Sequence, residues 1–143
     1  FKMNSDGGKE MRLTKNENLD DGPEFSPDGK YIYFNSFRTG KMQIWRMLVD
    51  GSNKEQMTFD EYSNWFAHIA PHNQNAVLIS YLEDQGQNHP FGRQVKLRLL
   101  NLNTKKVSNL TSSFFGGQGT INVHSWNPEG TQFAYVSYSF IDK

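Results

Sequence analysis

Nitrogen-bearing side chains that suit metal or ligand binding are spread along this 143-residue sequence. Those with the chemistry for a divalent metal are His68, His89, Gln118 and His124, because imidazole nitrogen and amide oxygen are both metal ligands. They are distant from one another in the sequence and lack the short ligand spacing of metal-binding motifs, so we expect no bound metal and no other cofactor. A polar ligand suits them better than a metal, and the other interpretation is that they form structural hydrogen bonds that hold the long loops. The residues that we expect to contact it are Arg38, Trp65, His68, His89, Arg93, Gln118 and His124.

Motifs for covalent or phosphate chemistry are absent from the sequence or incomplete. The segment Gly116-Gly117-Gln118-Gly119-Thr120 is rich in glycine, but it lacks the lysine and the following helix of a phosphate-binding loop. No Gly-x-Ser-x-Gly segment indicates a hydrolase nucleophile. Without cysteine there is no thiolate nucleophile and no disulfide framework. We therefore expect a binding protein more than an enzyme, and the sequence leaves catalysis open.

The charge balance excludes several classes of partner. The sequence has 15 Lys and Arg against 15 Asp and Glu, so its net charge is zero. Proteins that bind nucleic acid mainly through phosphates need a basic face, and polybasic membrane patches need the same. No apolar run approaches the roughly 18 residues of a membrane span. We expect no nucleic-acid partner and no membrane span.

Three segments of the sequence are copies of one another, and they indicate what positions the candidate side chains. Phe25-Ser26-Pro27-Asp28-Gly29-Lys30 recurs at residues 69–74 and 126–131. Two further markers, Leu13-Thr14 and Asp6-Gly7, recur at 57–58 and 50–51, so all three shift by 44 residues from the first copy to the second. A period of about 40–50 residues with strand-forming content is typical of propeller blades.

Each repeat is predicted to form four antiparallel strands. Residues 31–37 are rich in aromatic and β-branched side chains and follow an Asp-Gly turn. Residues 43–49 end at a second Asp-Gly turn. The short polar segment 54–58 suits an outer edge strand, and residues 23–26 suit a short inner strand before the Pro-Asp-Gly turn.

The sequence begins and ends partway through a repeat. We predict one partial propeller domain over residues 1–143, in which 1–14 end one blade, 23–58 and 65–111 form two complete blades, and 122–139 begin a closing blade. The strands expected in the two half-blades are Phe1–Met3, Glu10–Thr14, Asn122–Asn127 and Gln132–Ser139. Propellers typically have four or more blades, and unpaired strand edges favour association. We therefore expect these edges to pair with the remainder of the same propeller or with a second copy in a homodimer.

The second repeat is longer than the first. The interval from Thr58 to Thr111 is 53 residues, and that from Ile69 to Trp126 is 57, against 44 in the first repeat. The extra residues fall in loop 83–94, between the second and third strands, and in loop 112–122, between blades. Alternate connections of an antiparallel meander share a face, so both insertions are expected on one face, where repeat proteins commonly bind.

The first repeat resembles the PD40-type, WD-like repeat of TolB-like six-bladed propellers. The matching residues are Pro23, Phe25-Ser26-Pro27-Asp28-Gly29-Lys30, Gln43-Ile44-Trp45, Asp50-Gly51 and Met57-Thr58. Three further segments look like one bacterial TolB-like subfamily, and they are Trp65–Pro71, Asn88–Pro90 and Phe115–Asn122. The resemblance covers nearly the whole chain. It implies an all-β propeller of four-stranded antiparallel blades, of which this chain supplies the C-terminal three.

The resemblance also implies a bacterial, non-enzymatic scaffold, with the periplasm slightly favoured over the cytoplasm. The leading hypothesis is that it binds a protein partner or a small polar ligand on the face carrying loops 83–94 and 112–122. The alternative is a metal-dependent polysaccharide lyase of the oligogalacturonate type, since such propellers hold a metal with channel-facing His and Gln. No lyase histidine pattern matches this sequence residue by residue. A third hypothesis is a purely structural assembly module.

Overall fold

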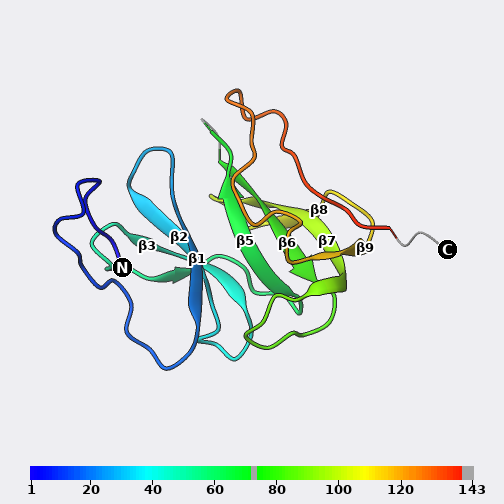
Figure 1. Cartoon of the computed structure of the whole chain (residues 1–143), viewed down its shortest axis with the longest axis horizontal. Helices are drawn as coiled ribbons and strands as arrows, with labels where there is room; N and C mark the ends of the chain where they lie inside the picture. The colour runs from blue at the N-terminus through cyan, green and yellow to red at the C-terminus, as the bar shows by residue number, and fades with distance from the viewer. Residues whose placement is uncertain (72–73, 140–143) are drawn as a thin grey trace.

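Two antiparallel sheets lie side by side in the computed structural model, which describes residues 1–71 and 74–139 (Figure 1). Those residues form strands, turns and irregular segments, with no α-helix among them. Consequently the described part of the chain has no helix of the length and apolarity needed to cross a bilayer. The inner strands, β1 (Asp20–Phe25) and β5 (Ser63–Ile69), contact each other between the two sheets.

The first sheet has the strand order β1-β2-β3-β4, in which β2 spans Tyr31–Ser36, β3 Gln43–Leu48 and β4 Glu55–Gln56. All neighbouring strands are antiparallel, which confirms the predicted four-stranded antiparallel blade. The inner strand begins at Asp20 rather than at Pro23, because a bulge lets its pairing with β2 continue beyond the irregular residues.

The second sheet has one strand more than predicted. Its order is β5-β6-β7-β8, with β6 at Asn75–Tyr81, β7 at Phe91–Asn101 and β8 at Val107–Asn109. The additional strand, β9 (Phe114–Gly117), pairs with the first residues of β7. The prediction that residues 112–122 form only a loop was therefore wrong. β7 is long enough for β8 and β9 to pair with successive parts of it, and β9 thereby covers strand edge that β8 leaves open.

The two ends of the chain are less regular than predicted. Instead of the four strands expected there, the structure has two isolated antiparallel bridges, Lys2 with Met11 and Trp126 with Phe133. A lone two-stranded hairpin is marginal, which explains why these segments stop short of regular strands. The turn predicted between the inner and second strands of the second repeat includes residues 72 and 73, which lie outside the described residues.

Each central strand contributes to two hydrophobic clusters. In β2, Tyr33 belongs to the cluster between the two sheets, whereas Ile32 and Phe34 belong to a cluster on the side of the N-terminal segment. In β6, Leu78 joins the first cluster and Val77 joins a third, near the C-terminal segment. Side chains alternate across a strand, so a sheet covered on both faces needs apolar residues at consecutive positions. This explains why the strand sequences show little polar alternation.

A buried polar network connects the blades where the first passes into the second. Nη1 of Arg98 donates to Oδ2 of Asp60 at 2.6 Å, and Oδ1 of Asp60 accepts from Nδ2 of Asn64 at 2.9 Å. Nδ2 of Asn64 also donates to Oε1 of Gln43 at 3.0 Å, and its Oδ1 accepts from Ser80. The network joins β3, β5, β6 and β7 to the connection between blades, so it fixes one blade against the next.

The turn between β1 and β2 supplies a testable electrostatic feature. The Asp28 carboxylate accepts hydrogen bonds from the Ser26 hydroxyl at 2.7 Å and from the Lys30 main-chain NH at 3.1 Å. These bonds lower the pKa of Asp28 from 3.8 to about 2. Because the folded-state pKa is lowered, the stability that the carboxylate contributes is complete above pH 4 or so and is lost as the pH falls through about 2.

We expect Ser26→Ala to raise the pKa of Asp28 back toward its ordinary value, because the variant removes the strongest of these hydrogen bonds. An NMR titration of the Asp28 side-chain carboxyl carbon measures the change. The exposed Asp6 serves as an internal control in the same spectra. An Asp28 pKa that stays the same in both proteins would contradict the assignment of its cause.

Candidate functional site

The two insertions of the second repeat form one structure rather than two separate loops. β7 begins at Phe91, inside the first insertion, and β9 lies inside the second. The strands pair with Phe91 opposite Gly117 and Gln94 opposite Phe115. The main-chain NH of Gln118 donates to the carbonyl of Pro90 at 3.3 Å. We call the surface formed by residues 83–94 and 112–122 the long-loop face.

Gly117 permits the close approach of the two insertions. Its φ is 117°, and a Cβ at this position would lie 2.1 Å from the carbonyl oxygen of Pro90, so a side chain is excluded. The same carbonyl accepts a hydrogen bond from the Tyr81 hydroxyl at 3.0 Å, and burial raises the pKa of that phenol. Pro90 is thus held from two sides, by β6 and by the second insertion.

The first insertion also reaches the first blade. Oε1 of Gln87 accepts a hydrogen bond from the main-chain NH of Leu19 at 2.7 Å. Nε2 of His89 lies 3.8 Å from Oδ2 of Asp21. The connection between β6 and β7 lies at the lower edge of the molecule in Figure 1, on the same side as the β2–β3 connection. The insertion therefore bridges the two blades on this face.

The imidazole of His89 packs against two aromatic rings of β5. Its centroid is 4.7 Å from that of Trp65 and 5.0 Å from that of Phe66, and both contacts are edge-to-face. The His89 side chain is 28% exposed, yet its Nδ1 is buried and has no hydrogen-bond partner among the described residues. Such an unpaired buried atom costs about 1–3 kcal/mol. The missing hydrogen bond at Nδ1 therefore calls for an explanation, such as a bound ligand that supplies it.

Phe66 has an unusual backbone conformation that accompanies this packing. Its φ is 51°, and it follows Gly22, with a φ of 58°, by the 44-residue repeat interval. Both residues lie where the inner strand changes register. The left-handed conformation costs a residue with a Cβ about 1–2 kcal/mol. The second blade therefore has a strained phenylalanine at the position where the first has glycine, and its ring holds His89.

His89 also lines a hollow of about 530 Å³ within the first insertion, which we call the loop pocket. The residues that line it are Gln85, Gln87, Asn88, His89, Pro90 and Arg93. Nε of Arg93 donates to Oε1 of Gln85 at 3.3 Å, and the Arg93 side chain is exposed. The lining offers amides, which both donate and accept hydrogen bonds, together with an imidazole and a guanidinium. This chemistry suits an oxygen-rich ligand.

His68 and His124 form a second group at the inner strands. Their ring centroids are 6.1 Å apart. Nδ1 of His68 contacts Oε2 of Glu24 at 2.6 Å, and its Nε2 contacts the carbonyl of Ile121 at 2.5 Å. Nε2 of His124 contacts the carbonyl of Ile69 at 3.1 Å. Because both ring nitrogens of His68 are engaged, this group links three successive inner segments through structural hydrogen bonds.

Arg38 and Gln118 take part in neither group. Arg38 contacts the Asp20 carboxylate at 3.1 and 3.2 Å, donates to Ser36 Oγ at 2.7 Å and lies 4.7 Å from the Trp45 ring centroid. Burial opposes ionisation of Asp20, but the Ser36 hydroxyl and the Arg38 guanidinium keep its pKa below the usual value. Arg38 thus stabilises the first blade. The Gln118 side chain is exposed on the turn after β9.

The four side chains considered as metal ligands do not form one centre. His89 lies in the loop pocket, whereas His68 and His124 lie at the inner strands. Over residues 1–71 and 74–139, no three His, Cys, Asp or Glu side chains converge as a metal would require. The arrangement therefore offers no support for the lyase alternative.

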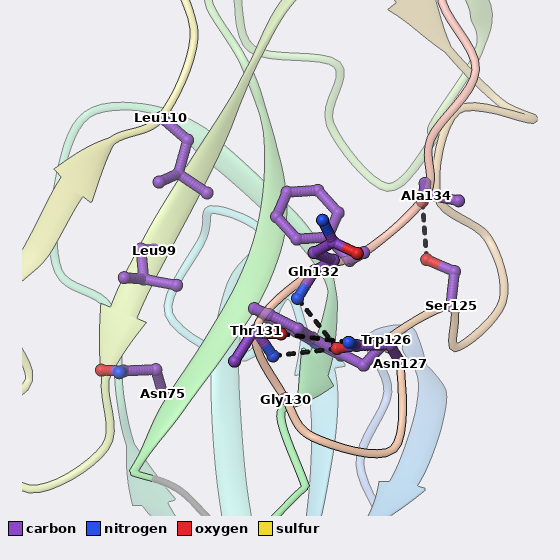
Figure 2. Close-up of a pocket in the computed structure, with 11 residues that line it drawn as sticks. Asn75, Leu99, Leu110, Ser125, Trp126, Asn127, Gly130, Thr131, Gln132 and Ala134 are labelled. Carbon is purple, nitrogen blue, oxygen red and sulfur yellow. Dashed lines mark hydrogen bonds between the residues drawn. The ribbon is translucent and has the colours of Figure 1, made fainter.

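A larger hollow of about 790 Å³ lies between the second sheet and residues 125–134 (Figure 2). Leu99 and Leu110 line one side, and Trp126 and Phe133, whose ring centroids are 4.9 Å apart, line the other. In a propeller, blade packs against blade at such a surface. Polar residues, among them Asn75, Thr131 and Gln132, line it as well. A mixed surface of this kind beside a half-blade suits the pairing of further strands.

Sequence reasoning missed several residues around His89. Phe66 was not singled out, although the repeat alignment sets it against Gly22 and so marks it as unusual. Asp21 faces His89 from 68 positions earlier in the chain, and no local pattern indicates that contact. Gln85 and Asn88 line the loop pocket but belong to a polar loop whose conformation has no sequence signature.

Comparison with known proteins agrees with the fold. The family model of the TolB beta propeller domain matches residues 1–141. An uncharacterised protein of Agrobacterium fabrum is 46% identical over 138 residues, which are 96% of this chain and 46% of that protein. The Tol-Pal system protein TolB of Bordetella pertussis is 38% identical over 52 residues, covering 36% of this chain and 12% of that protein.

Two solved structures are similar as well. A protein provisionally assigned as TolB from Agrobacterium tumefaciens superposes with a TM-score of 0.90 at 45% identity, covering 97% of this chain and 50% of that one. TolB from Acinetobacter baumannii has a TM-score of 0.62 at 17% identity, covering 79% and 26%, and shows a shared fold. This chain spans about half the length of its similar Agrobacterium relatives. It belongs to the TolB beta-propeller family and forms part of such a propeller.

Proposed function

We propose that this chain is part of a non-enzymatic scaffold that binds a protein partner or a small ligand on the long-loop face. The observation that carries the proposal is the pairing of the two insertions, β7 with β9, which builds a defined surface outside the repeat. Residues that a repeat does not need for its own packing are available for binding.

The candidate polar side chains are either engaged in contacts within the fold or exposed on the long-loop face, which supports binding more than catalysis. Both ring nitrogens of His68 are occupied, and Arg38 is committed to Asp20. By contrast, Arg93 and Gln118 are exposed on the long-loop face. The Bordetella relative is named as a Tol-Pal system protein, which makes a protein partner a reasonable expectation for this chain.

The remainder of the same propeller is the other partner that we propose. Residues 1–14 and 122–139 would be half-blades flanking the blades 23–58 and 65–111. Each half-blade has one isolated bridge, and more strands would complete it. A second copy of the chain would serve the same purpose in a homodimer. That the chain spans about half of its relatives' length favours the first of these partners.

Paired substitutions on opposite faces test the binding face. We expect Arg93→Ala with Gln118→Ala to weaken capture of the specific partner or ligand at least about tenfold, the effect of losing roughly 1.4 kcal/mol. The matched control combines Lys30→Ala and Asn103→Ala, two exposed residues on turns outside the insertions. Immobilised variants are incubated with a bacterial extract, and mass spectrometry quantifies retained proteins and small molecules. Equal capture by all variants, or equal loss in the control, would contradict the proposal.

A further inference from the structure

We propose that the loop pocket binds a small polyhydroxylated ligand, a monosaccharide or one end of an oligosaccharide, with His89 as a contact residue. This inference rests on the proposed binding function of the long-loop face and names a ligand class for it. It starts from the pocket of about 530 Å³ that Gln85, Asn88, His89 and Arg93 help to line.

The pocket lining matches hydroxyl groups in its hydrogen-bonding pattern. The side-chain amide of Asn88 can donate and accept hydrogen bonds, as vicinal hydroxyls also do. The Gln85 amide already donates to the carbonyl of Glu83 at 3.1 Å and accepts from Arg93 at 3.3 Å, and it retains one further N–H and one further lone pair. Arg93 adds donors in a fixed planar arrangement, and its Nε donates to Oε1 of Gln85 at 3.3 Å. A ligand whose groups both donate and accept can therefore satisfy this lining.

The charge around His89 favours a ligand that donates a hydrogen bond. Asp21 lies 3.8 Å from Nε2, which favours the tautomer with its proton on Nε2 and leaves Nδ1 as an acceptor. Nδ1 has no partner among the described residues. The torsion that turns an imidazole about its Cβ–Cγ bond is soft, so a modest rotation presents Nδ1 to the pocket. A hydroxyl has the proton that Nδ1 requires.

A simple anion fits this pocket less well. A carboxylate would complement Arg93, but it has no proton to donate to Nδ1 of His89. Among the described residues that line the pocket, Arg93 is the only Lys or Arg. The carboxylate of Asp21 lies on the far side of the imidazole and repels a second negative charge.

Phe66 is the positioning residue of this site. Its strained backbone, with a φ of 51°, places the ring 5.0 Å from that of His89. Trp65 contacts the same imidazole at 4.7 Å. Strain of this kind persists where surrounding contacts compensate for it, and it concentrates at binding sites. The two rings hold the imidazole beside the pocket, so binding requires little movement beyond the rotation about its Cβ–Cγ bond.

Binding is tested by calorimetry and NMR with D-glucose, D-galactose and maltose, and with inorganic phosphate as the anionic probe. We expect at least one saccharide to bind the wild-type chain and to shift the His89 ring signals, which are assigned by their absence from His89→Phe. That variant keeps an aromatic ring against Trp65 and Phe66 but removes both nitrogens. It should bind the saccharide at least about tenfold more weakly, with an unchanged Tm.

Phe66→Gly separates positioning from stability. Glycine adopts this φ without strain, so this variant should lose most saccharide affinity while keeping its fold by circular dichroism, and the His89 signals should broaden or move in the absence of ligand. Lys30→Ala, away from the pocket, should bind like the wild type.

Three outcomes would overturn the inference: no saccharide binds, saccharide binding survives in His89→Phe, or phosphate binds at His89 in place of the saccharide. If partner capture still depends on Arg93 and Gln118 in any of these cases, the ligand class fails while the binding function of the face stands.

Discussion

Replacing Arg98 by alanine is expected to lower the free energy of unfolding by about 3–5 kcal/mol, the typical cost of breaking a buried ion pair. Nη1 of Arg98 lies 2.6 Å from Oδ2 of Asp60, and the Arg98 side chain is only 9% exposed. Its guanidinium also lies 4.9 Å from the ring centroid of Tyr62. The variant removes the cation that pairs with the Asp60 carboxylate, which is itself largely shielded from water. Thermal unfolding should shift downward by about 10 °C for a chain of this size.

Arg93→Ala is the matched control, because Arg93 lies on the same strand but is exposed and forms only weak contacts. Its Tm should stay within a degree or two of the wild type. Adding Asp60→Asn to Arg98→Ala should recover part of the loss, since it removes the unpaired charge. Equal unfolding temperatures for Arg93→Ala and Arg98→Ala would show that the network is not what fixes one blade against the next.

Glu24→Ala should be the second most destabilising of these substitutions. The Glu24 carboxylate contacts Nδ1 of His68 at 2.6 Å and accepts from the main-chain NH of Ile69 at 2.8 Å. Its removal leaves two groups of the neighbouring inner strand unpaired, each costing about 1–3 kcal/mol. Chemical denaturation should report a loss of about 2–4 kcal/mol, and the Ile69 amide should exchange with deuterium faster.

Glu17→Ala provides the comparison for that measurement, because Glu17 is an exposed acidic residue of the same chain. The Ile69 amide should exchange in Glu17→Ala as in the wild type. If Glu24→Ala were as stable as Glu17→Ala, with Ile69 still protected, then the contact between Glu24 and His68 would not stabilise the inner strands.

The regular part of the fold could be predicted because each repeat carries its own boundaries. The Pro27-Asp28-Gly29 turn and the Asp50-Gly51 turn delimit strands close to β2 and β3 as observed. β9 could not be predicted in this way. Its residues, Phe114–Gly117, have little strand pattern of their own, and they become a strand because β7 presents an edge to them.

The candidate site was predictable only in outline. The interval change from 44 to 53 and 57 residues located the insertions, and the structure shows them joined through β7 and β9. The individual contacts were not predictable, because they depend on side chains from distant parts of the chain, such as Asp21 beside His89. The role of Trp65, His89 and Arg93 in ligand binding stays a prediction.

The pairing of β7 with β9 has a consequence for the ancestry of this protein. The strand edge of Phe91–Val95 is covered by β9, and β9 in turn depends on that edge for its main-chain hydrogen bonds. A descendant that lost either insertion alone would expose an uncovered strand edge, which promotes aggregation. Selection should therefore treat the two insertions as one inherited character, gained and lost together, although residues 95–111 separate them in the sequence.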